Sequence, residues 1–119
     1  MNRRAYGDAG EQAACAHLER KGWQILARNF RRGPGEIDII ARRRGVLAFV
    51  EVKRRSSLRF GRPAEAVTPE KQRRIVQAAA LYMQENGLED AQVRFDVIEL
   101  LPEQIRHIEG AFDATGHFD

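Results

Sequence analysis

Residues 36–53 read EIDIIARRRGVLAFVEVK, in which two apolar stretches flank the short basic segment 42–45. The first stretch is residues 36–41 and the second is residues 46–53. Both have the length and the branched apolar residues typical of strands, and a connection this short favours an antiparallel pair. The sequence therefore predicts a β-hairpin here, with three charged residues on its strands besides Glu36.

Those three residues are Asp38, Glu51 and Lys53. Side chains alternate between the two faces of a strand, so Glu51 and Lys53 share a face. Opposed residues in an antiparallel pair have a constant sum of positions. With a sum of 89 Asp38 lies opposite Glu51, and with a sum of 87 it lies opposite Phe49 and diagonal to Glu51. Either register separates the two carboxylates by roughly 5–8 Å and puts all three charges on one face.

Two carboxylates at this separation suit a hard divalent cation, because Mg²⁺ takes one or two carboxylates together with waters and phosphate oxygens. A neighbouring lysine can orient the attacking water or stabilise the charge that develops on the phosphate. The pattern therefore indicates metal-dependent phosphodiester cleavage, with Asp38 and Glu51 as ligands of Mg²⁺ or Mn²⁺. The plainer alternative is an ion pair on a solvated strand. Leu47 and Phe49 share the face of Glu51, and charges among apolar residues favour a functional site.

The charge of the chain is unevenly distributed. Residues 1–74 contain 18 Lys/Arg against 8 Asp/Glu, whereas residues 75–119 contain 2 against 9. Most of the basic residues are arginines, whose planar guanidinium binds phosphate through two hydrogen bonds at once. Because the basic half also holds the acidic pair, we expect a polyanionic substrate. A merely solubilising surface is the alternative interpretation.

Length and composition predict a single domain spanning residues 1–119. One cysteine, Cys15, excludes an internal disulfide. No apolar run follows the basic N-terminus, so we expect neither a signal peptide nor a membrane span, and a cytoplasmic protein.

The other segments complete an α/β pattern. We predict helices at residues 8–22 and from 68 to about 86, strands at 23–30, 93–100 and 105–108, a turn at 31–35 and a mobile arginine-rich loop at 54–63. Glu11 lies on the apolar stripe of the first helix, where it would either join the acidic site or cap the first turn. His17, His107 and His117 lack the spacing of metal ligands and are expected on the surface.

Four motifs together resemble the small bacterial YraN-type proteins. They are Gly10-Glu11-Gln12-Ala13-Ala14, Gly33-Pro34-Gly35-Glu36-Ile37-Asp38, Phe49-Val50-Glu51-Val52-Lys53 and Thr68-Pro69-Glu70-Lys71-Gln72. The resemblance extends over about residues 6–112. That family in turn resembles the restriction-endonuclease-like superfamily of PD-(D/E)xK nucleases, archaeal Holliday-junction resolvases in particular.

The resemblance implies a restriction-endonuclease-like fold, with a four-stranded mixed β-sheet core flanked by helices. Asp38, Glu51 and Lys53 match the motif residues, and Glu11 matches the acidic residue on the first helix of resolvase-like members. Ile37 stands where many members have a proline.

We therefore expect a Mg²⁺- or Mn²⁺-dependent nuclease acting on DNA rather than RNA, on branched or repair intermediates, as a possible homodimer. The catalytic residues would be Glu11, Asp38, Glu51 and Lys53, with the carbonyl of Val52 as a further metal ligand. The expected nucleic-acid contacts are Arg54, Arg55, Arg59, Lys71, Gln72 and Arg74. The competing hypothesis is a nucleic-acid-binding module with an inactive or weak nuclease site.

Overall fold

The computed structural model describes residues 3–55 and 67–115 of the chain. Two helices and five strands follow one another in the predicted order. They are α1 (Arg3–Arg20), β1 (Gln24–Arg32), β2 (Gly35–Arg43), β3 (Val46–Arg54), α2 (Pro69–Glu85), β4 (Gln92–Leu100) and β5 (Ile105–Phe112).

The strands form one mixed sheet in the order β1-β2-β3-β4-β5. Neighbouring strands are antiparallel except β3 and β4, which are parallel and joined through α2. The β2–β3 ladder ends at the pair Ile39↔Val50, which confirms the register with a sum of 89. Asp38 and Glu51 are therefore the next opposed positions, just beyond the last ladder pair.

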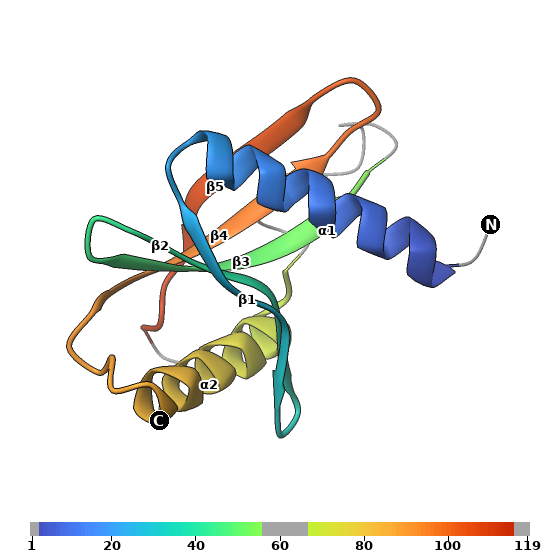
Figure 1. Ribbon diagram of the computed structural model, residues 1–119. Coiled ribbons are helices and arrows are strands. Elements are labelled where there is room, and N and C mark those ends of the chain that lie inside the picture. The colour runs from blue at the N-terminus through green and yellow to red at the C-terminus, as the bar shows by residue number, and fades with distance from the viewer. Residues whose placement is uncertain (1–2, 56–66, 116–119) are drawn as a thin grey trace.

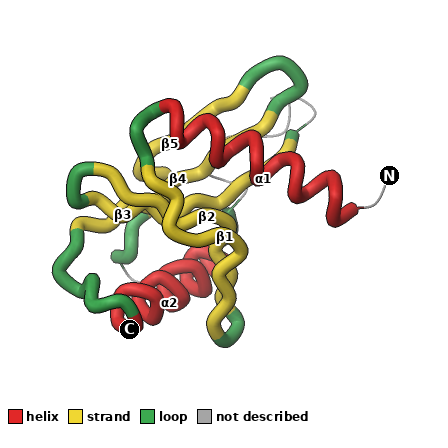
Figure 2. The backbone as a smooth tube through the Cα atoms, in the orientation of Figure 1, coloured by secondary structure: helices red, strands yellow, loops and turns green. Residues whose placement is uncertain are grey.

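The two helices cover opposite faces of the sheet, as Figures 1 and 2 show. On the α1 face, Ala14, Cys15 and Leu18 pack with Ile39 and Val50, among others, so the predicted helical stripe is confirmed. On the α2 face, Ile75, Val76 and Tyr82 pack with Leu47, Phe49 and Val97. A sheet buried on both faces explains why β2 and β3 read as nearly continuous apolar runs.

Local signals set the start of α2. The Thr68 hydroxyl accepts a hydrogen bond from the Lys71 amide at 3.2 Å, and Pro69 follows as the first helical residue. The predicted start of this helix is therefore confirmed, and it fixes Lys71 in the first turn. No helix in the described part of the chain is long and apolar enough to cross a membrane.

Three sequence predictions need correction. Arg31 and Arg32 belong to β1 rather than to a turn, and the chain reverses at Gly33 and Pro34. Strand β5 extends to Phe112, whereas the sequence predicts a strand that ends at residue 108. His107 is not on the surface as predicted, because its side chain is 2% exposed and contacts the buried Asp96. The predicted arginine-rich loop lies outside the described residues except for its first two positions.

Candidate active site

The candidate site lies at the C-terminal end of β3, where the β2–β3 ladder has just stopped. The Asp38 carboxylate accepts a hydrogen bond of 2.8 Å from the backbone amide of Val52. In a continued ladder that amide would face the backbone of Ile37. Asp38 thus replaces a backbone partner and bridges the two strands. Ile37 and Ile40 both join the α2 face, so the strict alternation of β2 breaks across Asp38.

Glu51 is 6% exposed, and its carboxylate forms ion pairs with two lysines on the α2 face of the sheet. Its Oε1 lies 2.5 Å from the Lys71 Nζ and 3.5 Å from the Lys53 Nζ. One lysine comes from α2 and the other from β3 itself. A buried carboxylate needs such partners, since an unpaired charge in the interior is strongly unfavourable.

The electrostatics of the pair depend on its burial. Burial, and then the nearby charge of Glu51, raise the pKa of Asp38 to about 7 against the opposing hydrogen bond from Val52. Burial, and then Lys71, lower the pKa of Lys53. Burial also lowers the pKa of the Lys71 ammonium. The hydrogen bond and charge interaction of that ammonium with Glu51 raise it, however, and the pKa lies above its ordinary value. Lys53 is therefore the amine that loses its proton more readily.

Glu11 reaches the same region from α1. Its Oε2 accepts hydrogen bonds from Asn29 at 2.9 Å and from Arg28 at 3.4 Å, and its charge contributes to the raised pKa of Asp38. Asn29 has a φ of 52°, in the left-handed region that asparagine tolerates better than most residues. Such backbone strain is often retained at functional sites. Helix α1 and β1 thus hold the acid near the carboxylate pair.

The predicted nucleic-acid contacts occupy several environments. Lys71 joins the acidic cluster, Arg54 is exposed at the end of β3, and Arg74 is exposed in an ion pair of 2.7 Å with Glu70. Arg59 lies outside the described residues.

Two of those predicted contacts also have partners within the protein. The Gln72 amide donates to the Val67 carbonyl at 2.9 Å. Arg55 is 14% exposed and lies 2.7 Å from the fully buried carboxylate of Glu99. These contacts hold the start of α2 and the end of β3, and the binding of phosphate by Arg55 and Gln72 stays a prediction.

Sequence reasoning missed several residues of this region. The ion pair of Lys71 with Glu51 could have been inferred from the helix start at Thr68, because Lys71 then falls one turn before the buried Ile75. Arg28 and Asn29 gave no comparable signal, since their role depends on the crossing of α1 over β1.

The site offers a divalent cation a small ligand set. In the described part of the chain, no group of three or more His, Cys, Asp and Glu side chains is placed to hold a metal ion. Asp38 and Glu51 would therefore be the side-chain ligands, with backbone oxygen and water completing the shell. This set fits Mg²⁺, which keeps several waters and binds through one or two carboxylates.

Comparison with known proteins gives a consistent family. The model of the "Uncharacterised protein family UPF0102" matches residues 10–100. A UPF0102 protein of Lachnoclostridium phytofermentans is 50% identical over 117 residues, covering 98% of this chain and 99% of that protein. One from Symbiobacterium thermophilum is 50% identical over 119 residues, covering 96% of this chain and all of that protein.

One solved structure shares the fold. A Holliday junction resolvase from Archaeoglobus fulgidus superposes with a TM-score of 0.51 and 18% sequence identity, covering 90% of this chain and 79% of that one. This similarity confirms the restriction-endonuclease-like α/β fold that the sequence predicts.

Proposed function

Because the chain belongs to the UPF0102 family of YraN-like proteins and has a resolvase-like fold, we propose that it is a metal-dependent nuclease acting on DNA. One observation carries the proposal: the half-buried Asp38 and the buried Glu51 stand with Lys53 at the end of two paired strands. A purely structural ion pair would not require a second carboxylate whose pKa is raised to about 7.

We assign roles from the contacts of each side chain. Asp38 and Glu51 would hold Mg²⁺ or Mn²⁺, which supplies Lewis-acid polarisation of the scissile phosphate and neutralises developing charge. Lys53 lies 3.5 Å from Glu51 and has a lowered pKa, so its amine can accept a proton from the attacking water. Glu11, held by Asn29, would orient that water.

The proposed phosphate contacts are cations near the site whose side chains are accessible to a substrate. Lys71 is 40% exposed although it touches Glu51, so its ammonium can turn from the carboxylate to a substrate phosphate. Arg54, Arg59 and Arg74 remain proposed contacts for the backbone on either side of the cut. The resolvase name of the structural neighbour favours branched DNA over plain duplex as the first substrate to try.

A nucleic-acid-binding module with an inactive site is the second candidate. One observation in its favour is that the Lys71 ammonium forms an ion pair with Glu51. The other is that the described residues place no third carboxylate with the acidic pair to hold a metal ion. In this case the lysine would replace the positive charge that an ion supplies in a nuclease.

Lys53→Met separates the two candidates, because it keeps the length of the side chain and removes the amine. For a nuclease we expect the single-turnover cleavage rate to fall by about 10²-fold or more, the scale of one lost transition-state contact. Affinity measured in Ca²⁺ should stay within a few-fold of wild type. Arg73→Gln, on the outer exposed face of α2, is the control and should cleave normally.

The substrates are labelled branched, flapped, duplex and single-stranded DNA with Mg²⁺ or Mn²⁺. If wild-type protein cleaves none of them while still binding, the binding module is the correct function.

A further inference from the structure

The described cations differ in whether they form an ion pair with a carboxylate. Six arginines each contact a carboxylate, in the pairs Arg28–Glu11, Arg31–Glu36, Arg32–Glu85, Arg55–Glu99, Arg74–Glu70 and Arg94–Asp96. By contrast, Lys21, Arg42, Arg43 and Arg44 have no carboxylate partner among the described residues. We call these four residues the basic tip. Arg20, Arg73 and Arg106 also lack a carboxylate partner in the part of the chain that the structure describes, but the basic tip gathers four such cations around one hollow.

The basic tip surrounds a shallow hollow of about 490 Å³. Its wall consists of the four cations together with Gly22 and Gln24, and it includes no acidic residue. The hollow is lined by residues at the β2–β3 turn, before the start of β3 at Val46, whereas Glu51 lies near the other end of that strand. It is thus separate from the candidate active site and has the charge of an anion-binding surface.

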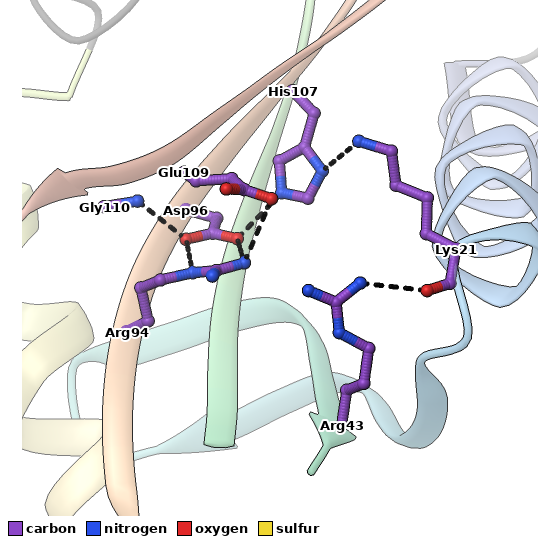
Figure 3. A network of polar contacts seen from close by, with 7 residues as sticks. All are labelled: Lys21, Arg43, Arg94, Asp96, His107, Glu109 and Gly110. Atoms are coloured by element: carbon purple, nitrogen blue, oxygen red, sulfur yellow. Dashed lines mark hydrogen bonds and ion pairs between the residues drawn. The ribbon is translucent and has the colours of Figure 1, made fainter.

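Two of the cations are held in place, as Figure 3 shows. The Arg43 guanidinium stacks 4.6 Å above the Trp23 ring and donates to the Lys21 carbonyl at 2.9 Å. The Lys21 ammonium lies 3.4 Å from the Nδ1 of His107. A held cation loses less side-chain entropy when it binds an anion, so the tip is prepared for phosphate.

His107, which contacts Lys21, is itself held by a buried carboxylate. The His107 Nε2 lies 2.7 Å from the buried carboxylate of Asp96. An Nε2–H that donates to Asp96 leaves Nδ1 as the acceptor for Lys21. Arg94 and the Gly110 amide also bond to Asp96, and although burial acts in the other direction these bonds hold the pKa of Asp96 below its ordinary value. This buried network positions a surface lysine.

Arg44 gives an independent indication. Arg43 pairs with Val46, so Arg44 and Gly45 alone form the turn, with φ angles of 51° and 79°. Two-residue turns of this type favour Asn-Gly, because a larger side chain is strained at a positive φ. An arginine there lowers local stability and places a charge at the outermost point of the hairpin. Backbone strain in an exposed turn is an accepted starting point for a hypothesis of function.

We propose that the basic tip binds the sugar–phosphate backbone of the same nucleic acid that is cut at Glu51, a proposal that rests on the function proposed above. From Val46 to Glu51 the strand rises roughly 17 Å at about 3.3 Å per residue. One strand of duplex DNA presents a phosphate about every 3.4 Å along the axis, so the tip contacts the duplex about five nucleotides from the cut. The exposed edge strand β1 joins the two regions, from Gln24 at the hollow to Asn29 beside Glu11.

Arg44→Asn tests the proposal without unfolding the turn, because asparagine favours this conformation. The measurement is affinity in Ca²⁺ over a range of salt for a duplex of about 20 base pairs and one of about five. We expect weaker binding of the long duplex, a salt slope lower by about one, and unchanged binding of the short duplex. The melting temperature should not fall. Arg42→Gln/Arg44→Asn should lower the slope by about two.

The matched control is Arg73→Gln, which removes one positive charge from the outer face of α2. An equal loss of affinity in Arg73→Gln and Arg44→Asn would overturn the proposal, since it would show an effect of net charge alone. An unchanged salt slope in Arg44→Asn would overturn it as well. Failure of the nuclease function is recognised separately, as wild-type protein that binds the long duplex through the tip and does not cleave it.

Discussion

The environment of Asp38 opposes its negative charge. The side chain is half-buried and faces Glu51, and against these effects the Val52 amide donates a hydrogen bond to its carboxylate. A side chain chosen for stability alone would be a neutral residue of similar size. A cation bound by the pair, as proposed above, would reverse the repulsion between the two carboxylates.

The first residue-scale prediction is a pH dependence of stability in metal-free protein. Burial and Glu51 raise the pKa of Asp38 from 3.8 to about 7. Because the folded state then holds the proton more tightly than the unfolded state, the contribution of Asp38 is fully present below 3.8 and is lost as pH rises through about 7. Asp38→Asn removes this dependence, so we expect the variant to be less pH-dependent than wild type and more stable at pH 8.

Urea unfolding with EDTA between about pH 5 and pH 8.5 measures this difference. Because this range includes about two pH units below the pKa of about 7, its size is on the order of 3 kcal/mol at about 1.4 kcal/mol per unit. Glu36→Gln, which alters an exposed carboxylate on the same strand, should keep the pH profile of wild type. Parallel profiles for Asp38→Asn and wild type would show that Asp38 is ionised throughout.

The sequence could predict that Asp38, Glu51 and Lys53 lie on adjacent strands because strand alternation and a short turn leave few registers. It could not identify Asn29 or His107, whose partners are 18 and 11 residues away and belong to other elements. Contacts of this kind depend on how α1 and β5 lie against the sheet, which no local pattern encodes.

At the scale of elements, α2 is positioned by a glycine in β2. A Cβ on Gly35 would fall against the Arg74 carbonyl and only 2.8 Å from the Cβ of Ala78. The strand and the helix therefore approach more closely than any other residue would allow. This approach sets how far Lys71, one turn before Arg74, can reach toward Glu51.

The element-scale prediction follows from that contact. Gly35→Ala should destabilise the protein by about 1–3 kcal/mol, the range for overpacking a closely packed contact, and should move Lys71 away from Glu51. Unfolding in urea measures the stability. Gly33→Asn is the control in the same hairpin, because Gly33 has a φ of 55°, has no atom near its missing Cβ, and asparagine tolerates this φ. Equal losses in both variants would assign the effect to the turn rather than to the helix contact.

Most elements were predictable because their signals are local: the Thr68-Pro69 helix start, the Gly22 stop with a φ of 90°, and the apolar strands. The predicted end of β1 was wrong because the sequence of Arg31 and Arg32 is typical of a polar turn. In the structure they form ion pairs with Glu36 and Glu85 along an exposed edge strand, where polar residues are ordinary.

For the whole molecule, metal binding and stability are linked. A divalent ion that binds only the folded protein stabilises it by mass action. With a Kd of about 1 mM, about 10 mM Mn²⁺ adds roughly 1.4 kcal/mol, which corresponds to a rise of about 5 °C in the melting temperature of a domain this small. Asp38→Asn/Glu51→Gln should show no such rise.

The control for this last prediction is Glu89→Gln/Asp90→Asn, which removes two exposed carboxylates and should keep the full shift. The pH adds a second requirement. Because the ion binds ionised Asp38, whose pKa is about 7, the shift should be larger at pH 8 than at pH 6. Equal shifts in wild type and in Asp38→Asn/Glu51→Gln would place the ion elsewhere on the acidic surface, and the carboxylate pair would then need another explanation.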